Sequence, residues 1–182
     1  MSERILVVLQ AEKEIRSQLH KYCRALDRLD RDLLGSVWHS NGKLHDSEKG
    51  QIAPFAHLID GIIDGYRTFA THIHQVTNPF IKIESGRAVS ESLVMAILRS
   101  HPDLSGCIVD THCRGRYLDH WSKRDGRWAI DERHIISSFS WEQTVVEGSM
   151  GRFARRGLED PIYGLISSLP ANAGISAGSE ER

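Results

Sequence analysis

The sequence places two histidines one residue apart, at His72 and His74. In a strand, residues two apart share a face, so both imidazoles can point into one cavity. Such a pair can ligate a metal ion, and an imidazole can also act as a general base because it titrates near neutral pH. Since no Asp, Glu or His elsewhere falls at a convincing ligand spacing, we predict no metal.

Asp27 is a second candidate, because it lies at the edge of an apolar stripe on a helix that begins near Ile5 or Ala11. The stripe repeats at three- and four-residue spacing and comprises Ile15, Leu19, Tyr22, Cys23 and Leu26. A buried carboxylate is costly unless it is paired, so Asp27 would need a partner such as a histidine. The alternative is a solvated charged face, formed with the neighbouring arginines and aspartates.

Arg133 is a third candidate and follows the segment Trp128-Ala129-Ile130, which alternates like a strand. Strict alternation turns Arg133 away from the Trp128 face unless a bulge intervenes. The alternative is a surface arginine that pairs with Asp131 or Glu132. Three more histidines on predicted strands are expected at the surface or at an interface rather than as ligands: His112, His120 and His134.

The segment after the first helix predicts two further helices. Asp30 can cap a short helix that reaches Trp38, and Asn41-Gly42 would stop it. The polar segment 43–51 is predicted to hold a short strand at most. Pro54 then suits the first turn of a third helix.

From residue 71 onward the hydrophobic period changes to that of strands. Four strands are predicted, at 71–83, 88–98, 108–121 and 127–139. The pair Asp125-Gly126 is a strong hairpin signal between the last two. Helices followed by antiparallel strands predict an α+β fold in which the helices cover one face of a curved sheet.

The length of 182 residues suits one domain, predicted at 1–147, followed by a C-terminal extension at 148–182. In the extension we predict one short helix within 158–169. Its end, 171–182, is small and polar, and we expect it to be disordered.

Charge and cysteine content exclude several classes of protein. The 23 Lys and Arg residues balance 24 Asp and Glu residues, which argues against a nucleic-acid or anionic-membrane partner. Three cysteines without metal-like or redox-like spacing fit a reduced compartment. The apolar run 5–9 is too short for a signal peptide, and no later run approaches a membrane span. We therefore predict a cytoplasmic protein.

Three stretches of the sequence together resemble one family. The first is residues 22–30, followed by Trp38; the second is residues 74–88; the third is residues 115–130, followed by Arg133. In order and spacing, over roughly residues 8–145, they resemble SnoaL-like proteins of the nuclear transport factor 2-like superfamily. The resemblance implies a cone-shaped α+β barrel, in which a curved mixed or antiparallel sheet and N-terminal helices enclose one apolar pocket.

Within this family the residues look most like an elimination branch that includes scytalone dehydratase, hexachlorocyclohexane dehydrochlorinase and bile-acid 7α-dehydratase. Asp27 and His74 fall on the positions of the acid–histidine pair of those enzymes. The resemblance implies that His74 is the base and that Asp27 orients it. It further implies that Tyr22 donates a hydrogen bond to developing charge and that Arg133 assists the leaving group.

The protein implied by this resemblance is a cofactor-independent lyase acting on a small, cyclic, largely apolar substrate. Substrate contacts are expected from His72, Trp38, Phe55 and Tyr117. A homo-oligomer is expected, as a trimer or else a dimer. Two alternatives stay open: an isomerase or polyketide cyclase that uses the same base, and a non-catalytic ligand-binding or dioxygenase small-subunit-like protein.

Overall fold

The computed structural model of the chain describes residues 3–46, 50–145 and 155–168. The chain divides into two compact units, Met1–Ser149 and Met150–Arg182. In the second unit, a 3-10 turn at Gly157–Glu159 precedes helix α4, Pro161–Ser167, which falls inside the range predicted for a short helix. The predicted disordered end, 171–182, lies outside the described residues.

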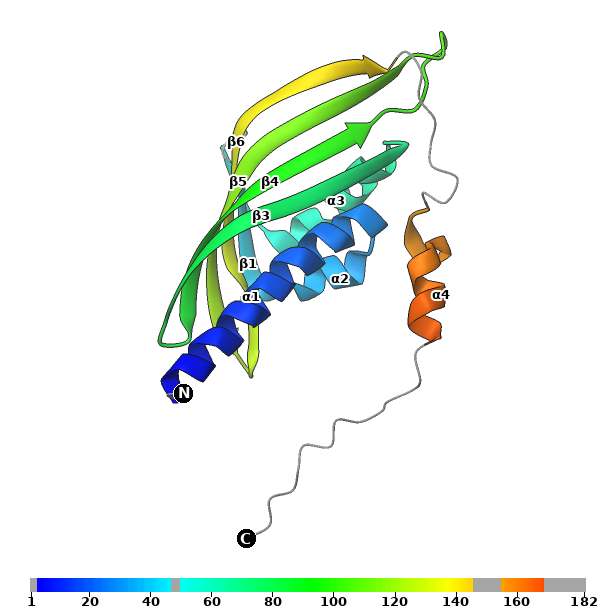
Figure 1. Cartoon of the computed structure of the whole chain (residues 1–182). Coiled ribbons are helices and arrows are strands. Elements are labelled where there is room, and N and C mark those ends of the chain that lie inside the picture. The colour runs from blue at the N-terminus through cyan, green and yellow to red at the C-terminus, as the bar shows by residue number, and fades with distance from the viewer. Residues whose placement is uncertain (1–2, 47–49, 146–154, 169–182) are drawn as a thin grey trace. The chain divides into compact units, whose positions relative to one another are not determined.

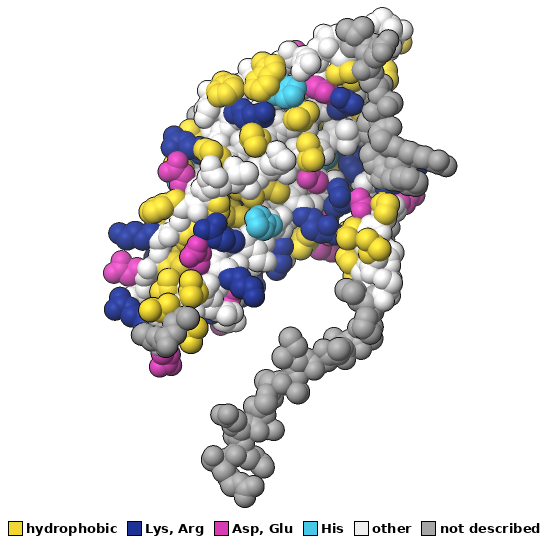
Figure 2. Space-filling view, in the orientation of Figure 1, with side chains coloured by type: hydrophobic (Ala, Val, Ile, Leu, Met, Phe, Trp, Pro, Cys, Tyr) yellow, Lys and Arg dark blue, Asp and Glu magenta, His cyan; other side chains and the backbone are white. Residues whose placement is uncertain are grey.

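The described residues of the first unit form three helices: α1 at Glu3–Arg28, α2 at Arg31–Ser36 and α3 at Phe55–Arg67. The predicted stripe of α1 is its buried face. Asp30 caps α2 as predicted, and its carboxylate accepts a hydrogen bond from the Leu33 amide at 2.9 Å. By contrast, apolar side chains at the start of α1, from Ile5 to Leu9, are exposed (Figure 2).

The six strands of the first unit form one sheet in the order β2-β1-β6-β5-β4-β3. Their bounds are β1 Trp38–Asp46, β2 Gln51–Pro54, β3 Thr71–Glu84, β4 Arg87–Arg99, β5 Ile108–Arg124 and β6 Arg127–Val145. The pair β1–β6 is parallel and the other pairs are antiparallel, so the sheet is mixed. The sheet curves over α1, α2 and α3 (Figure 1), which confirms the predicted α+β fold, but it ends at β2 and β3 and does not close into a full barrel.

The predicted second helix is too long at its C-terminal end. Helix α2 ends at Ser36, and the chain from Trp38 onward is strand β1. Strand β1 extends into the segment 43–51, where a short strand at most was expected, and strand β2 begins at the last residue of that segment. Gly42 does not stop a helix: a Cβ there would lie 3.0 Å from the Ile130 carbonyl oxygen, so glycine lets β1 approach β6 closely. Pro54 ends β2 and precedes α3 as its N-cap rather than lying in its first turn.

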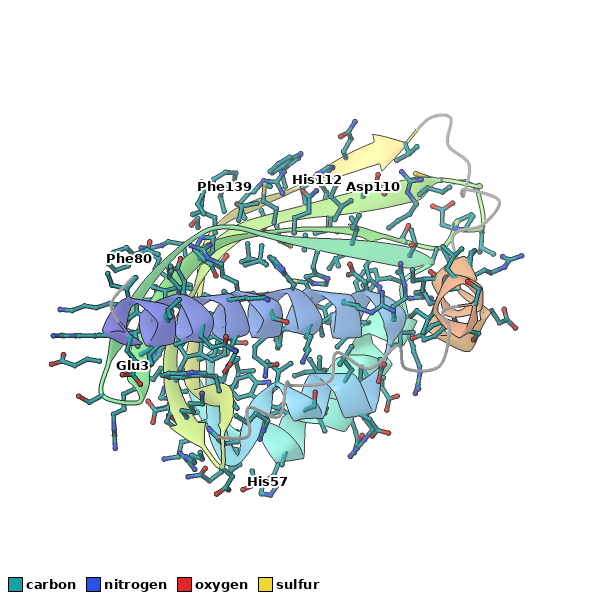
Figure 3. The ribbon with its side chains drawn as sticks, turned by 60° about the horizontal axis from the view of Figure 1, so that its bottom comes forward. Glu3, His57, Phe80, Asp110, His112 and Phe139 are labelled. Carbon is teal, nitrogen blue, oxygen red and sulfur yellow. The ribbon has the colours of Figure 1, made fainter. Side chains whose placement is uncertain are left out.

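The two faces of the sheet differ in what they contact. Phe139 and His112 lie on the side that faces away from the helices, whereas His57 lies on α3 (Figure 3). The opposite side packs on the helices and carries the core, including Tyr117, Trp121 and Ile130. None of the helices in the described parts of the chain is long and apolar enough to cross a membrane.

Candidate functional site

Asp27 in the last turn of α1 contacts His74 near the start of β3. Nδ1 of His74 lies 2.8 Å from Oδ1 of Asp27. The same carboxylate accepts the backbone N–H of His74 at 3.0 and 3.2 Å. His72 and His74 are buried while Ile73 between them is 51% exposed, so the two imidazoles share the inner face of the strand. Asp27 therefore links helix α1 to strand β3 through both the backbone and the ring of His74.

The other ring nitrogen of His74 contacts Tyr66 of α3. The distance from Nε2 to the Tyr66 hydroxyl is 3.0 Å. Burial raises the pKa of Tyr66, so the hydroxyl stays protonated and its O–H donates a hydrogen bond to Nε2. A carboxylate only accepts, so Nδ1 of His74 carries the ring hydrogen toward Asp27. Asp27, His74 and Tyr66 form a hydrogen-bonded chain in which Nε2 has the lone pair that a general base needs.

His72 contacts the helix rather than an open space. Its Nε2 donates to the carbonyl oxygen of Leu26 at 2.8 Å, and its ring centroid lies 4.7 Å from that of Tyr66. This bond fixes the tautomer of His72. The residue that was expected to contact substrate thus supports Tyr66 and the end of α1.

Asp27, His72 and His74 could also hold a metal ion, since their ligand atoms lie within 4.8 Å of one another. The sequence offered no third ligand at a convincing spacing from the two histidines, but the fold brings Asp27, 47 residues before His74, within reach of both. Both nitrogens of His74 and Nε2 of His72 are engaged in hydrogen bonds. A metal ion would have to replace these bonds. The three side chains are therefore better explained as hydrogen-bonding partners than as metal ligands.

Arg133 is fully buried on the inner face of the sheet because β6 carries a bulge. His120 pairs with Glu132 and Trp121 pairs with Ile130, so Asp131 is the extra residue. The bulge turns Arg133 to the same side as Ile130. The alternative of a surface arginine paired with Asp131 or Glu132 is wrong.

The partner of Arg133 is Asp119 of β5. Nε lies 2.7 Å from Oδ1 and Nη2 lies 2.9 Å from Oδ2. Burial opposes the charge of Arg133, but the carboxylate outweighs burial and raises the pKa of the guanidinium. The guanidinium carbon lies 4.1 Å from the ring centroid of Tyr22 and 4.0 Å from that of Tyr117. The positive charge of Arg133 therefore lies against the rings of Tyr22 and Tyr117.

An apolar cavity of about 560 Å³ lies between α3 and the inner face of the sheet. Three tyrosines from different elements line it: Tyr22, Tyr66 and Tyr117. The remaining lining is mostly apolar and comprises Leu44, Asp46, Ala53, His57, Leu58, Gly61, Ile62, Gly65, Phe69, Leu98 and Ile135. His74 does not line this cavity and contacts it only through the hydroxyl of Tyr66.

Two of the residues expected to contact substrate belong to the packed core instead. The rings of Trp38 and Phe55 stack with centroids 4.1 Å apart, and both residues are at most 4% exposed. The ring of Trp38 lies behind that of Tyr22, with centroids 6.4 Å apart. Trp38 and Phe55 therefore support the cavity wall without lining it, whereas Tyr117 does line it.

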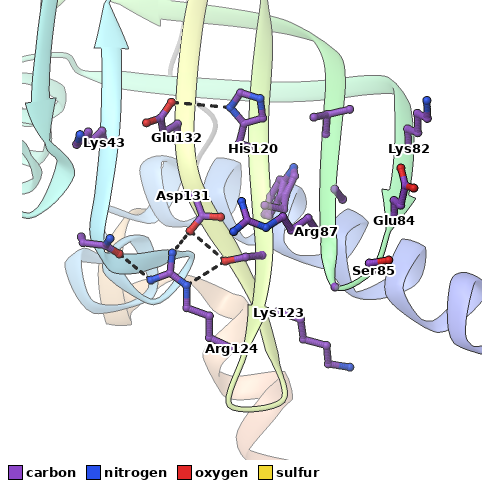
Figure 4. Close-up of a pocket in the computed structure, with 16 residues that line it drawn as sticks. Lys43, Lys82, Glu84, Ser85, Arg87, His120, Lys123, Arg124, Asp131 and Glu132 are labelled. Atoms are coloured by element: carbon purple, nitrogen blue, oxygen red, sulfur yellow. Dashed lines mark hydrogen bonds and ion pairs between the residues drawn. The ribbon is translucent and has the colours of Figure 1, made fainter.

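Other hollows lie elsewhere on the first unit. A groove of about 750 Å³ along α1 and β3 includes Asp27 and His74 in its wall. A charged cleft of about 930 Å³, between the ends of β3–β4 and β5–β6, contains none of the predicted site residues (Figure 4). The candidate site therefore consists of the apolar cavity, which Tyr66 lines, and the hydrogen-bonded pair of His74 and Asp27 behind Tyr66, which borders the groove.

Sequence reasoning missed Tyr66 and Asp119. Tyr66 belongs to the apolar stripe of α3, where an aromatic residue is typical of a core position. Asp119 offered a usable signal, because it shares one face of β5 with the buried Tyr117 and Trp121. A charged residue between two large buried ones calls for a buried partner of opposite charge.

Comparison with known sequences gives one family. A sequence profile of the SnoaL-like domain matches residues 7–134. No curated protein is significantly similar to the chain.

Several solved structures share the fold. A provisionally named scytalone dehydratase from Novosphingobium aromaticivorans is 21% identical, with a TM-score of 0.62 and coverage of 78% of this chain and 93% of that chain. A hexachlorocyclohexane dehydrochlorinase of type 3 from Novosphingobium barchaimii is 13% identical, with a TM-score of 0.63 and coverage of 80% and 97%. A provisionally named aromatic ring hydroxylase from Novosphingobium aromaticivorans is 16% identical, with a TM-score of 0.61 and coverage of 76% and 95%. At these identities the likeness establishes the fold alone, and the activity has to be argued from the site.

Proposed function

The chain belongs to the SnoaL-like family, as its sequence motifs predicted, and from this premise we propose that it is a cofactor-independent lyase with His74 as its base. The observation that carries the proposal is the hydrogen-bonded chain of Asp27, His74 and Tyr66, with His74 buried and Tyr66 lining an apolar cavity. The family and two of the structural neighbours support a lyase-like role. The acid–base pair supplies the chemistry that an elimination needs.

In the proposed reaction, Nε2 of His74 takes a proton from a substrate carbon. The electron pair of that C–H bond forms the new double bond, and a hydroxide or halide departs with its own bonding pair. Asp27 accepts the Nδ1–H and stabilises the imidazolium that forms. The substrate first displaces the Tyr66 hydroxyl, which holds Nε2 in the free protein.

Tyr22 is the proposed hydrogen-bond donor to the leaving group, because it lines the cavity and faces Arg133. Burial raises the pKa of Tyr22, and the charge of Arg133 partly counteracts this effect. The cation thus favours developing negative charge on the phenol oxygen or on a group bonded to it. Arg133 assists the leaving group through Tyr22 and is a positioning residue.

The cavity defines the proposed substrate class. Its volume of about 560 Å³ falls in the range of roughly 300–1,000 Å³ that holds small organic ligands. Its mostly aliphatic and aromatic wall favours a compact, cyclic, largely apolar molecule. Among the lining side chains, Asp46 is the one carboxylate and His57 is the one other group that can carry a charge near neutral pH.

Turnover of hydroxylated steroids, phenolics and halogenated rings tests the proposal. We expect elimination that falls at least about 100-fold in His74→Ala. The matched control is His101→Ala, in the exposed β4–β5 loop, which should retain full activity. We expect Tyr66→Phe to lower KM, because the substrate no longer competes with a hydroxyl for Nε2.

A non-catalytic ligand-binding protein is the second candidate. One observation favours it: the side chain of His74 is only 2% exposed, and the Tyr66 hydroxyl occupies Nε2, the nitrogen that would act as the base. A binding protein would keep ligand affinity in His74→Ala and show no turnover to lose. An isomerase or polyketide cyclase would depend on His74 but yield a product without loss of a leaving group.

We also propose that the protein is a homo-oligomer, as a trimer or a dimer. Large apolar side chains on the strands are exposed, including Val89 at 41%, Leu93 at 42% and Phe139 at 59%. Exposed apolar patches of this kind mark interaction surfaces. Native mass spectrometry of the purified protein tests this proposal, and a monomer at micromolar concentration would contradict it.

A further inference from the structure

Four potential metal ligands lie side by side on three neighbouring strands, apart from the candidate site. His45 of β1 pairs with His134 of β6, and His120 of β5 pairs with Glu132 of β6. Glu132 and His134 are two residues apart, so their side chains share one face of the strand. The fold thus assembles a cluster from segments that are distant in sequence.

This cluster lies on the outer face of the sheet. The residues that alternate with it, Leu44 and Arg133, are buried against the inner core. Figure 4 shows Glu132 and His120 facing one another across β6 and β5. The cluster is therefore separated from the Asp27–His74 pair by the thickness of the sheet.

The spacing of the ligand atoms suits a small cation. Ligand atoms of His45, Glu132 and His134 all lie within 4.8 Å of one another. Oε2 of Glu132 lies 3.7 Å from Nε2 of His45 and 3.8 Å from Nδ1 of His120. Neighbouring ligands around a tetrahedral ion with bonds of about 2.0–2.1 Å are about 3.3–3.4 Å apart. These two gaps are too long for hydrogen bonds but only slightly wider than a coordination shell.

Nε2 of His45 is buried and has no hydrogen-bond partner among the described residues. A buried polar nitrogen without a partner calls for an explanation, such as an ion.

We propose that His45, Glu132 and His134 bind a divalent transition metal of the zinc class, with His120 as a fourth ligand. Imidazole nitrogens with one carboxylate are a donor set that Zn²⁺ and its neighbours prefer. The rings of His45 and His134 stack with centroids 4.0 Å apart. Rotation of each ring about its side-chain bonds would direct one nitrogen of each toward a shared ion. The metal would tie β1 to β6, the one parallel pair in the described sheet.

Equilibrium dialysis of the chelator-treated full chain against Zn²⁺, followed by metal analysis, tests the proposal. We expect saturable binding that weakens at least tenfold in His45→Ala and in His134→Ala. His120→Ala should have a smaller effect. The matched control His101→Ala, from an exposed loop, should bind like the unmodified protein.

The Asp27–His72–His74 group is the competing site, and His72→Ala distinguishes it. Zinc binding that survives His134→Ala but is lost in His72→Ala would overturn the proposal, as would the absence of saturable binding. His134→Asn keeps a polar side chain of similar size and guards against a folding defect. Zinc should raise the Tm of the unmodified protein, but not that of folded His134→Asn.

Discussion

Arg133 and Asp119 form a two-point ion pair in which both side chains are 0% exposed. The rings of Tyr22 and Tyr117 lie against the same guanidinium. Nη1 of Arg133 has no hydrogen-bond partner within the part of the chain that the structure describes. The ion pair therefore holds two tyrosines of the cavity wall in place, and the stability of the fold and the shape of the cavity depend on the same contact.

Asp119→Asn should destabilise the protein strongly. The substitution leaves the buried charge of Arg133 uncompensated, which costs about 3–5 kcal/mol when one partner of a buried pair is removed. Urea unfolding measures the free energy of unfolding. The double variant Asp119→Leu with Arg133→Met should be more stable than Asp119→Asn, because no charge is left buried. Equal stability of the two variants would show that the loss comes from packing and not from charge.

Asp27→Ala should cost more stability than Asp27→Asn. The carboxylate of Asp27 accepts both the ring and the backbone N–H of His74, so alanine leaves a backbone donor without its partner. An unsatisfied buried donor costs about 1–3 kcal/mol, and the asparagine oxygen can still accept one bond. Urea unfolding compares the two variants, and hydrogen exchange at the His74 amide reports the bond directly. Equal losses would mean that the backbone bond adds nothing to stability.

The fold class could be predicted from the sequence because its signals are local. The period of two from residue 71 onward predicted β3 to β6, and each observed strand is longer than its prediction by residues at its ends. Asp30 at the start of α2 was predicted from cap chemistry alone. Strand β1 could not be predicted, because Gly42 has a packing role that only the approach of β6 reveals.

The candidate site was predictable only in part. A carboxylate at the edge of a buried stripe needs a partner, and this argument pointed from Asp27 toward a histidine. Arg133 points inward because of the bulge at Asp131. The sequence is compatible with a bulge in this strand but does not show at which residue it lies. Tyr66 could not be singled out, since its hydroxyl gains a role only when α3 is packed beside His74.

Gly115→Ala should destabilise the sheet. A Cβ at Gly115 would clash with the backbone carbonyl oxygen of Ile136 on the neighbouring strand, and a backbone atom cannot swing aside as the end of a side chain can. Overpacking of this kind costs about 1–3 kcal/mol. Gly61→Ala in α3 is the control, because its Cβ meets nothing within 4 Å and alanine favours a helix by up to about 1 kcal/mol. Thermal unfolding of both variants measures the difference, and a Gly115→Ala protein as stable as Gly61→Ala would contradict the close approach.

His45 should make the protein less stable as the pH falls. Burial first, and then His134, lower the pKa of His45 below its ordinary 6.5, although Glu132 acts in the opposite direction. As the pH falls below that ordinary value, the unfolded chain binds a proton at His45 before the folded protein does. The stability from His45 is therefore complete above pH 6.5 and is lost as the pH falls through the lower folded pKa.

His45→Gln removes this contribution, so the variant should lose less of its free energy of unfolding between about pH 7.5 and about pH 5 than the unmodified protein does. Urea unfolding in the presence of a chelator measures this, because the chelator separates proton binding from metal binding. His101→Gln, in an exposed loop, should follow the unmodified protein at every pH. If the curves for His45→Gln and the unmodified protein run parallel, then His45 titrates alike in the folded and unfolded states and is not held neutral by its surroundings.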